Sequence, residues 1–83
     1  MKIEVKATEP IRKLFTDLEC GDVFSTRPTV SEKTLFVKTE RGYRDNQGRY
    51  MVNGVGLISE DIHGFGNEFH VYVPREVKII VNP

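Results

Sequence analysis

The 83-residue sequence has one cysteine, no tryptophan, no net charge and no long apolar run. Cys20 alone excludes an internal disulfide and a multi-cysteine zinc site, and no signal-peptide pattern follows Met1, which favours a reducing cytoplasm. Twelve basic and twelve acidic side chains cancel, so no overall field attracts nucleic acid or an anionic membrane. The longest apolar stretch, 77–81, is too short to cross a bilayer. We therefore expect a cytoplasmic protein that binds no membrane, with Cys20 as a small buried thiol.

The length predicts a single domain over residues 1–83. A domain of this size buries only about 60% of the surface that its unfolded chain exposes, which leaves little room for a deep catalytic cleft. Five Phe and three Tyr are enough for a compact core. We expect a non-enzymatic protein that needs no cofactor.

Alternation of apolar and polar residues predicts several short strands, separated by turn residues. The expected strands are 2–6, 23–26, 34–39, 49–52, 55–59, 68–73 and 77–81. The polar stretch 40–48 contains two glycines and predicts a hairpin loop. Asn53-Gly54 favours a type I′ turn between two strands, although one bulged strand also satisfies it.

Residues 8–21 have the pattern of a short helix. Thr8 suits the cap and Pro10 suits the first turn, and Gly21 is a typical stop. The apolar residues fall on one helical face, at Ile11, Leu14, Phe15 and Leu18. The expected fold is mainly β, a small antiparallel barrel or curled sheet of five to seven short strands with one short N-terminal helix.

The segments "FTDLECGDVF", 15–24, and "LFVKT", 35–39, resemble a group of small bacterial and phage proteins that form SH3-like barrels. The resemblance implies that Gly21-Asp22 turns the chain so that Val23 and Phe24 enter the barrel, and that Leu35 and Val37 belong to its core. It implies a phage or mobile-element origin. It transfers no functional residue, because many members have no known role and one fold serves many purposes.

The stretch "ISEDIHGFGNEFHVYV", 58–73, contains the only cluster of metal-ligand types, which are Asp61, His63, Glu68 and His70. The two histidines lie seven residues apart across two glycines, a spacing that no standard site uses. A metal-dependent hydrolase that uses His63 and His70 is therefore the third hypothesis, and we assign no metal ligand. The alternative interpretation is a solvated loop with His70 on the outer face of a strand.

Residues 38–50 interleave cations with tyrosines, as barrels that bind single-stranded nucleic acid do. The residues that would serve are Lys38, Arg41, Arg44, Arg49 and Tyr50. The local excess of positive charge is small, and the pattern favours a soluble hairpin with tyrosines at its base over nucleic-acid binding. The glycines of "HGFGNEF" lack the P-loop ending, although their amides suit an anion, so a nucleotide-like ligand belongs to this second hypothesis.

The leading hypothesis is a binding module that engages a host or partner protein through loops 40–48 and 60–67. The residues expected to contact the partner are Tyr43, Arg44, His63 and Phe65. Phe65 is the most unusual of these residues, because its large apolar side chain stands between two glycines. Its ring either contacts the partner or folds back into the core. An alternative is that the N-terminal strand 2–6 pairs with its copy in a second chain, which would give a homo-oligomer by edge pairing.

Overall fold

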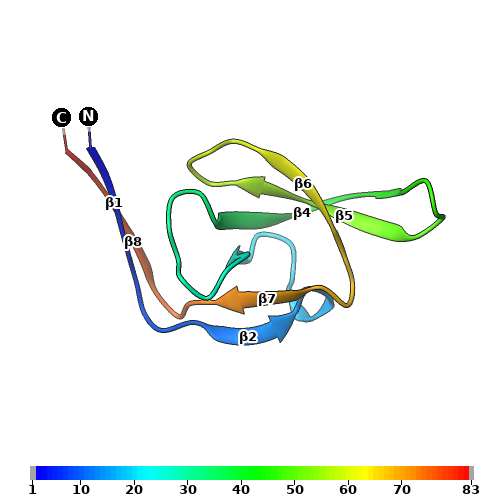
Figure 1. The fold of residues 1–83 in the computed structure, drawn as a ribbon, viewed down its shortest axis with the longest axis horizontal. Helices are drawn as coiled ribbons and strands as arrows, with labels where there is room; N and C mark the ends of the chain where they lie inside the picture. The colour runs from blue at the N-terminus through cyan, green and yellow to red at the C-terminus, as the bar shows by residue number, and fades with distance from the viewer. Residues whose placement is uncertain (1, 83) are drawn as a thin grey trace.

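The structure, a computed structural model, describes residues 2–82 as eight strands and one turn of 3-10 helix (Figure 1). The strands are β1 (Lys2–Ala7), β2 (Ile11–Leu14), β3 (Val23–Ser25), β4 (Leu35–Arg44), β5 (Tyr50–Gly56), β6 (Ile62–Gly66), β7 (His70–Val73) and β8 (Val77–Asn82). The 3-10 turn is η1 (Phe15–Asp17). The prediction of a mainly β fold is confirmed, with more strands than the five to seven expected. No helix of the described chain is long and apolar enough to span a membrane.

Six strands form one antiparallel sheet in the order β2-β7-β3-β4-β5-β6. The sheet curls, so that Phe65 of β6 stacks on Phe15 of η1, which directly follows β2. The amides of Phe15 and Thr16 donate hydrogen bonds to the carbonyls of Phe69 and Asn67, between β6 and β7. Within residues 2–82 the outer strands β2 and β6 do not pair with each other. The sheet is therefore curled but not closed, and the structure shows no barrel.

The core lies inside the curl and is mostly aromatic. Its fully or nearly buried side chains are Phe15, Leu18, Phe24, Phe36, Phe65 and Val71. The Phe24 ring meets the edges of Phe15 and Phe65 at centroid distances of 5.4 and 5.2 Å, and Phe65 stacks on Phe15 at 5.2 Å. Such offset and edge contacts add about 0.5–1.5 kcal/mol per pair beyond area burial. A small chain thus gains a stable core from few residues.

The predicted helix over 8–21 is wrong. Residues 11–14 form β2, in which Ile11 lies opposite Val73, and only η1 is helical. The Thr8 hydroxyl does not cap a helix; it accepts hydrogen bonds from the amides of Arg75 and Glu76 at 2.9 and 3.1 Å. The spacing of apolar residues was misleading because a strand followed by one tight turn also brings Phe15 and Leu18 into the core.

Gly21 has a φ of 94°, which favours glycine, and its amide donates to the Lys38 carbonyl at 2.8 Å. The turn leads into β3, where Phe24 is fully buried. In β4 Leu35 is buried as expected, but Val37 is only half-buried, and Phe36 joins the aromatic core instead.

Residues 50–56 form one strand, so the hairpin expected at Asn53-Gly54 is wrong and the single-strand alternative describes it. The bulge is not in this strand but in β4, where the register with β5 shifts between Lys38 and Gly42. Gly54 has no room for a side chain, because a Cβ there would lie 2.7 Å from the Phe65 ring and 3.1 Å from the Phe24 ring. Glycine at this position lets two core rings approach the backbone.

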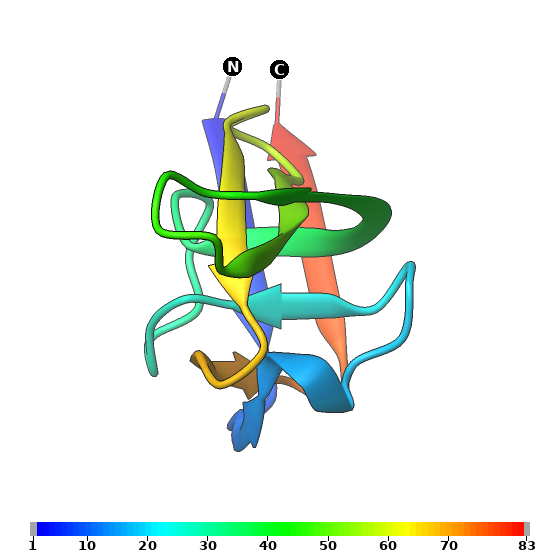
Figure 2. The same cartoon turned by 90° about the vertical axis from the view of Figure 1, so that its right-hand side faces the viewer.

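Strands β1 and β8 form a separate two-stranded antiparallel ribbon that leaves the curled sheet and ends at both chain termini (Figures 1 and 2). The N-terminal strand is thus paired within the chain, with Ile3 opposite Val81 and Ala7 opposite Val77. The described chain measures 44 × 24 × 17 Å along its principal axes. The elongated shape follows from this projecting ribbon.

Candidate partner-binding surface

Phe65 points into the core. Its side chain is 6% exposed and contacts the rings of Phe15, Phe24 and Phe36. The hypothesis that Phe65 anchors a partner is therefore wrong, and the alternative, that the ring folds back into the domain, is correct. The expected loop 60–67 is also wrong in most of its length, because 62–66 is strand β6.

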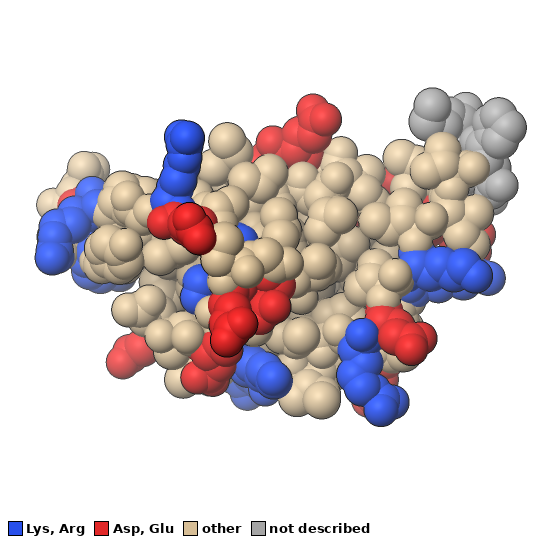
Figure 3. All heavy atoms as spheres, turned by 180° about the vertical axis from the view of Figure 1, so that it is seen from behind, with Lys and Arg blue, Asp and Glu red and all other residues tan. Residues whose placement is uncertain are grey.

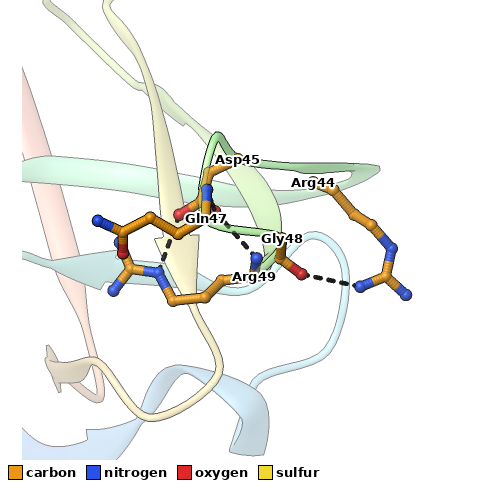
Figure 4. A network of polar contacts seen from close by, with 5 residues as sticks. All are labelled: Arg44, Asp45, Gln47, Gly48 and Arg49. Atoms are coloured by element: carbon orange, nitrogen blue, oxygen red, sulfur yellow. Dashed lines mark hydrogen bonds and ion pairs between the residues drawn. The ribbon is translucent and has the colours of Figure 1, made fainter.

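The other expected loop, 40–48, is largely strand as well. β4 runs to Arg44, and a tight turn at 45–48 leads to β5. Asp45 organises this turn: its carboxylate accepts hydrogen bonds from the amides of Gln47 and Arg49 and from the Arg49 guanidinium, all at 2.9 Å (Figure 4). The Arg49 amide is the main cause that lowers the pKa of Asp45 below 3.8. Arg44 donates to the Gly48 carbonyl at 3.0 Å.

The cations and tyrosines of 38–50 do not share one face. Tyr43 lies opposite Met51 and Arg44 opposite Tyr50, so the two tyrosines occupy opposite faces of the hairpin. Lys38 points inward and donates to the carbonyls of Phe15 and Leu18 at 3.0 and 2.6 Å. Arg41 is exposed, whereas Arg49 pairs with Asp45. Basic and acidic side chains are also interspersed on the face shown in Figure 3. This arrangement provides no continuous nucleic-acid groove.

Strand β6 is the last strand of the sheet, and among residues 2–82 no strand pairs with its outer edge. On one side it pairs with β5, and the Gly56 amide donates to the Asp61 carbonyl at 2.7 Å, which makes these two residues a hydrogen-bonded pair. Because hydrogen-bonded pairs alternate along an antiparallel ladder, the amides and carbonyls of Ile62 and Gly64 point away from β5. Ile62 is 66% exposed. The edge thus combines outward backbone groups with an exposed apolar side chain.

The two expected contact segments do adjoin each other. The Tyr43 hydroxyl occupies the space that a Cβ on Gly64 would fill, so the tyrosine crosses β5 and lies over β6. By strand alternation Tyr43, Asn53, Val55 and Ile62 lie on the same face, which is the outer face of the sheet. Tyr43 is 44% exposed.

A shallow hollow of about 590 Å³ opens beside this edge on the outer face. Val55 and Ile62 give it an apolar wall, and the residues around it also include Cys20, Thr39, Arg41 and Asn53. We call the combination of the β6 edge, Tyr43 and this hollow the β6-edge surface. Sequence reasoning missed Ile62, although the alternation Ile62, Gly64 and Gly66 against His63 and Phe65 is a strand signal.

Of the remaining expected contact residues, His63 and Arg44 lie on the core-facing side of the sheet, at its rim. The His63 ring is exposed and meets Phe36 edge-on at 5.4 Å. The expected set therefore divides: only Tyr43 belongs to the β6-edge surface.

His63 lies on β6 and His70 on β7, two strands that do not pair. Within residues 2–82 no group of three or more His, Cys, Asp or Glu side chains is placed to hold a metal ion. The third hypothesis, a metal-dependent hydrolase, therefore gains no support from the arrangement. Cys20 is exposed rather than buried, which corrects that expectation.

No protein-family model, curated protein or solved structure matches this chain significantly. The resemblance to small bacterial and phage barrel proteins stays a prediction, as does the origin that it implies. Function must therefore be argued from the surface itself.

Proposed function

We propose that this chain is a non-enzymatic binding module that adds an extended segment of a partner protein to the free edge of β6. The observation that carries the proposal is the pair of outward-facing backbone positions, Ile62 and Gly64, beside an exposed isoleucine. An extended peptide that pairs with an exposed sheet edge gains affinity from main-chain hydrogen bonds and specificity from pockets for alternate side chains.

The outer face supplies the side-chain contacts. A strand paired with β6 directs every second side chain towards this face, where the hollow beside Val55 and Ile62 accepts an apolar group. Tyr43 is the aromatic anchor at the other end of the surface, because aromatic side chains contribute strongly to binding at low entropic cost. The partner segment is thus an extended one with apolar residues two apart.

The free edge β2 provides a matched control. Ile11 in β2 is 56% exposed and Ile62 in β6 is 66% exposed, and both belong to edge strands of the same sheet. A lysine on an edge strand opposes the addition of another strand. Ile62→Lys and Ile11→Lys therefore introduce the same charge and remove the same apolar group at the two edges.

The test begins with a displayed library of random linear peptides, selected on the purified protein. The affinity of one selected peptide is then measured by fluorescence anisotropy for the wild type and both variants. We expect Ile62→Lys to weaken binding at least about tenfold, equivalent to about 1.4 kcal/mol, and Ile11→Lys to leave it unchanged. Equal effects of the two variants, or no selected peptide that depends on Ile62, would refute the proposal.

A further inference from the structure

In the ribbon of β1 and β8, the side of β1 that faces away from β8 is another strand edge, remote in sequence from β6. The Thr8 amide donates to the Glu76 carbonyl at 3.1 Å, and the register of the ribbon places these residues opposite each other. Because hydrogen-bonded pairs alternate in an antiparallel ladder, the backbone groups of Ile3, Val5 and Ala7 point away from β8. Within residues 2–82 no other strand pairs with them.

On the polar face of the ribbon, no acidic residue lies directly opposite a basic one. Lys6 lies opposite Lys78, and Glu4 lies opposite Ile80. Like charges directly opposite each other destabilise a strand pair. Glu4 and Lys6 are both exposed, and no ion pair in the described chain includes either of them. The ribbon therefore carries one like-charge pair and an acid with no basic residue directly opposite it.

We propose that two copies of this chain form a dimer in which β1 pairs antiparallel with β1 of the second copy, centred on Val5. In this register Val5 meets Val5, Ile3 meets Ala7, and Glu4 of each copy meets Lys6 of the other. The pairs Ile3–Ala7 and Val5–Val5 use the outward backbone groups. Glu4 and Lys6 then form the non-hydrogen-bonded pairs, whose side chains lie closest together.

The charge pattern selects this register over its neighbours. Centring on Glu4 would place Glu4 against its own copy, and centring on Lys6 would do the same with two lysines. Centring on Ile3 would pair only residues 2–4 of the described chain. The register centred on Val5 forms two opposite-charge pairs by symmetry, and it gives Lys6 an acid on the side away from Lys78.

The proposed β1–β1 pairing would also stabilise the ribbon of β1 and β8. A two-stranded ribbon is marginally stable in water, whereas three or more strands with an apolar face are independently stable. One face of the ribbon is wholly apolar and consists of Ile3, Val5, Ala7, Val77, Ile79 and Val81. Val81 is 55% and Ile79 38% exposed. Dimerisation makes a four-stranded sheet in which Ile3 and Val5 gain apolar neighbours from the second copy.

The proposal is independent of partner binding, because β6 belongs to the other sheet. It is tested by sedimentation equilibrium of the full chain across a dilution series. A reductant is present because the exposed Cys20 would otherwise cross-link copies.

The variants are Glu4→Lys, Lys6→Glu and the double exchange. Glu32→Lys and Lys33→Glu make the same charge changes at exposed residues outside the strands and serve as controls. Circular dichroism verifies that each variant is folded.

We expect a concentration-dependent dimer for the wild type and for both control variants. Each single reversal makes both symmetry-related pairs repulsive and is expected to raise the dissociation constant at least about tenfold. The double exchange restores opposite charges in the same register and is expected to recover the dimer. A monomeric wild type would overturn the proposal. A dimer that survives both single reversals would also overturn it, because another surface, such as β8, would then form the contact.

Discussion

The ammonium group of Lys38 lies 4.5 Å from the centroid of the Phe15 ring and donates a hydrogen bond to the Phe15 carbonyl at 3.0 Å. The same group donates to the Leu18 carbonyl at 2.6 Å. One side chain of β4 thus fixes both ends of η1, the turn that brings Phe15 and Leu18 into the core. These contacts give the Lys38 cation a structural role within the fold.

We predict that Lys38→Met destabilises the folded state by about 1–3 kcal/mol, because two carbonyls lose a charged donor and the Phe15 ring loses its cation. Urea denaturation followed by circular dichroism measures the change. Lys33→Met, at an exposed position between β3 and β4, is the control and is expected to change the free energy of unfolding little. An equal change in the free energy of unfolding for the two substitutions would contradict a structural role of Lys38.

The same substitution is expected to have different costs at Gly54 and Gly64. A Cβ on Gly54 would lie 2.7 Å from the Phe65 ring, which is packed in the core, so Gly54→Ala is expected to cost about 1–3 kcal/mol. A Cβ on Gly64 would meet the end of the exposed Tyr43 side chain, which is free to rotate away. Gly64→Ala is therefore expected to cost less. Thermal unfolding of both variants decides, and a larger loss for Gly64→Ala would contradict the placement of the core.

Phe65→Ala is expected to destabilise the fold by about 3–5 kcal/mol, because it removes the ring at the centre of the aromatic cluster and leaves a cavity. Leu57→Ala, at a residue 41% exposed, is the comparison and is expected to have a small effect. Chemical denaturation of the two variants measures the difference. If Phe65→Ala left stability unchanged, the ring would not be buried.

The Asp45 carboxyl has a pKa below its ordinary value of 3.8, chiefly because it accepts a hydrogen bond from the Arg49 amide. A depressed pKa in the folded state means that this group stabilises the turn above pH 3.8 and that the contribution is lost as the pH falls through the lowered pKa. We expect an NMR titration of the Asp45 side chain to show that lowered pKa. Asp45→Asn is expected to speed hydrogen exchange at the amides of Gln47 and Arg49. A titration midpoint at or above 3.8 would contradict the hydrogen-bond pattern of Figure 4.

Alternation in the sequence predicted the strands that have regular apolar neighbours, as at Val71 and Val73 in β7 or Val77 and Val81 in β8. It failed where tertiary contacts decide. The spacing of Ile11 and Leu14 fits a helix rather than a strand, in which residues three apart lie on opposite faces, yet residues 11–14 pair with β7. Local propensity is a weak guide when a segment has a strand available to pair with.

The candidate surface was predictable only in part. Tyr43 was expected on a loop as an exposed aromatic residue; it is 44% exposed, but it lies on strand β4. Phe65 was misassigned because its glycine neighbours suggested a loop, whereas Gly64 accommodates the Tyr43 side chain on the opposite face from Phe65. The role of Ile62 depends on which strand ends the sheet, and strand order is set by long-range pairing that a local pattern does not contain.

The most direct test of the central claim is amide hydrogen exchange along β6, measured by NMR without and with a selected peptide. In the free protein the amides of Ile62 and Gly64 face outward and should exchange quickly, while those of His63 and Phe65 face β5 and should be protected. Bound peptide is predicted to slow exchange at Ile62 and Gly64 at least about tenfold. Binding that protects neither amide, or that protects the turn at 45–48 instead, would contradict the account.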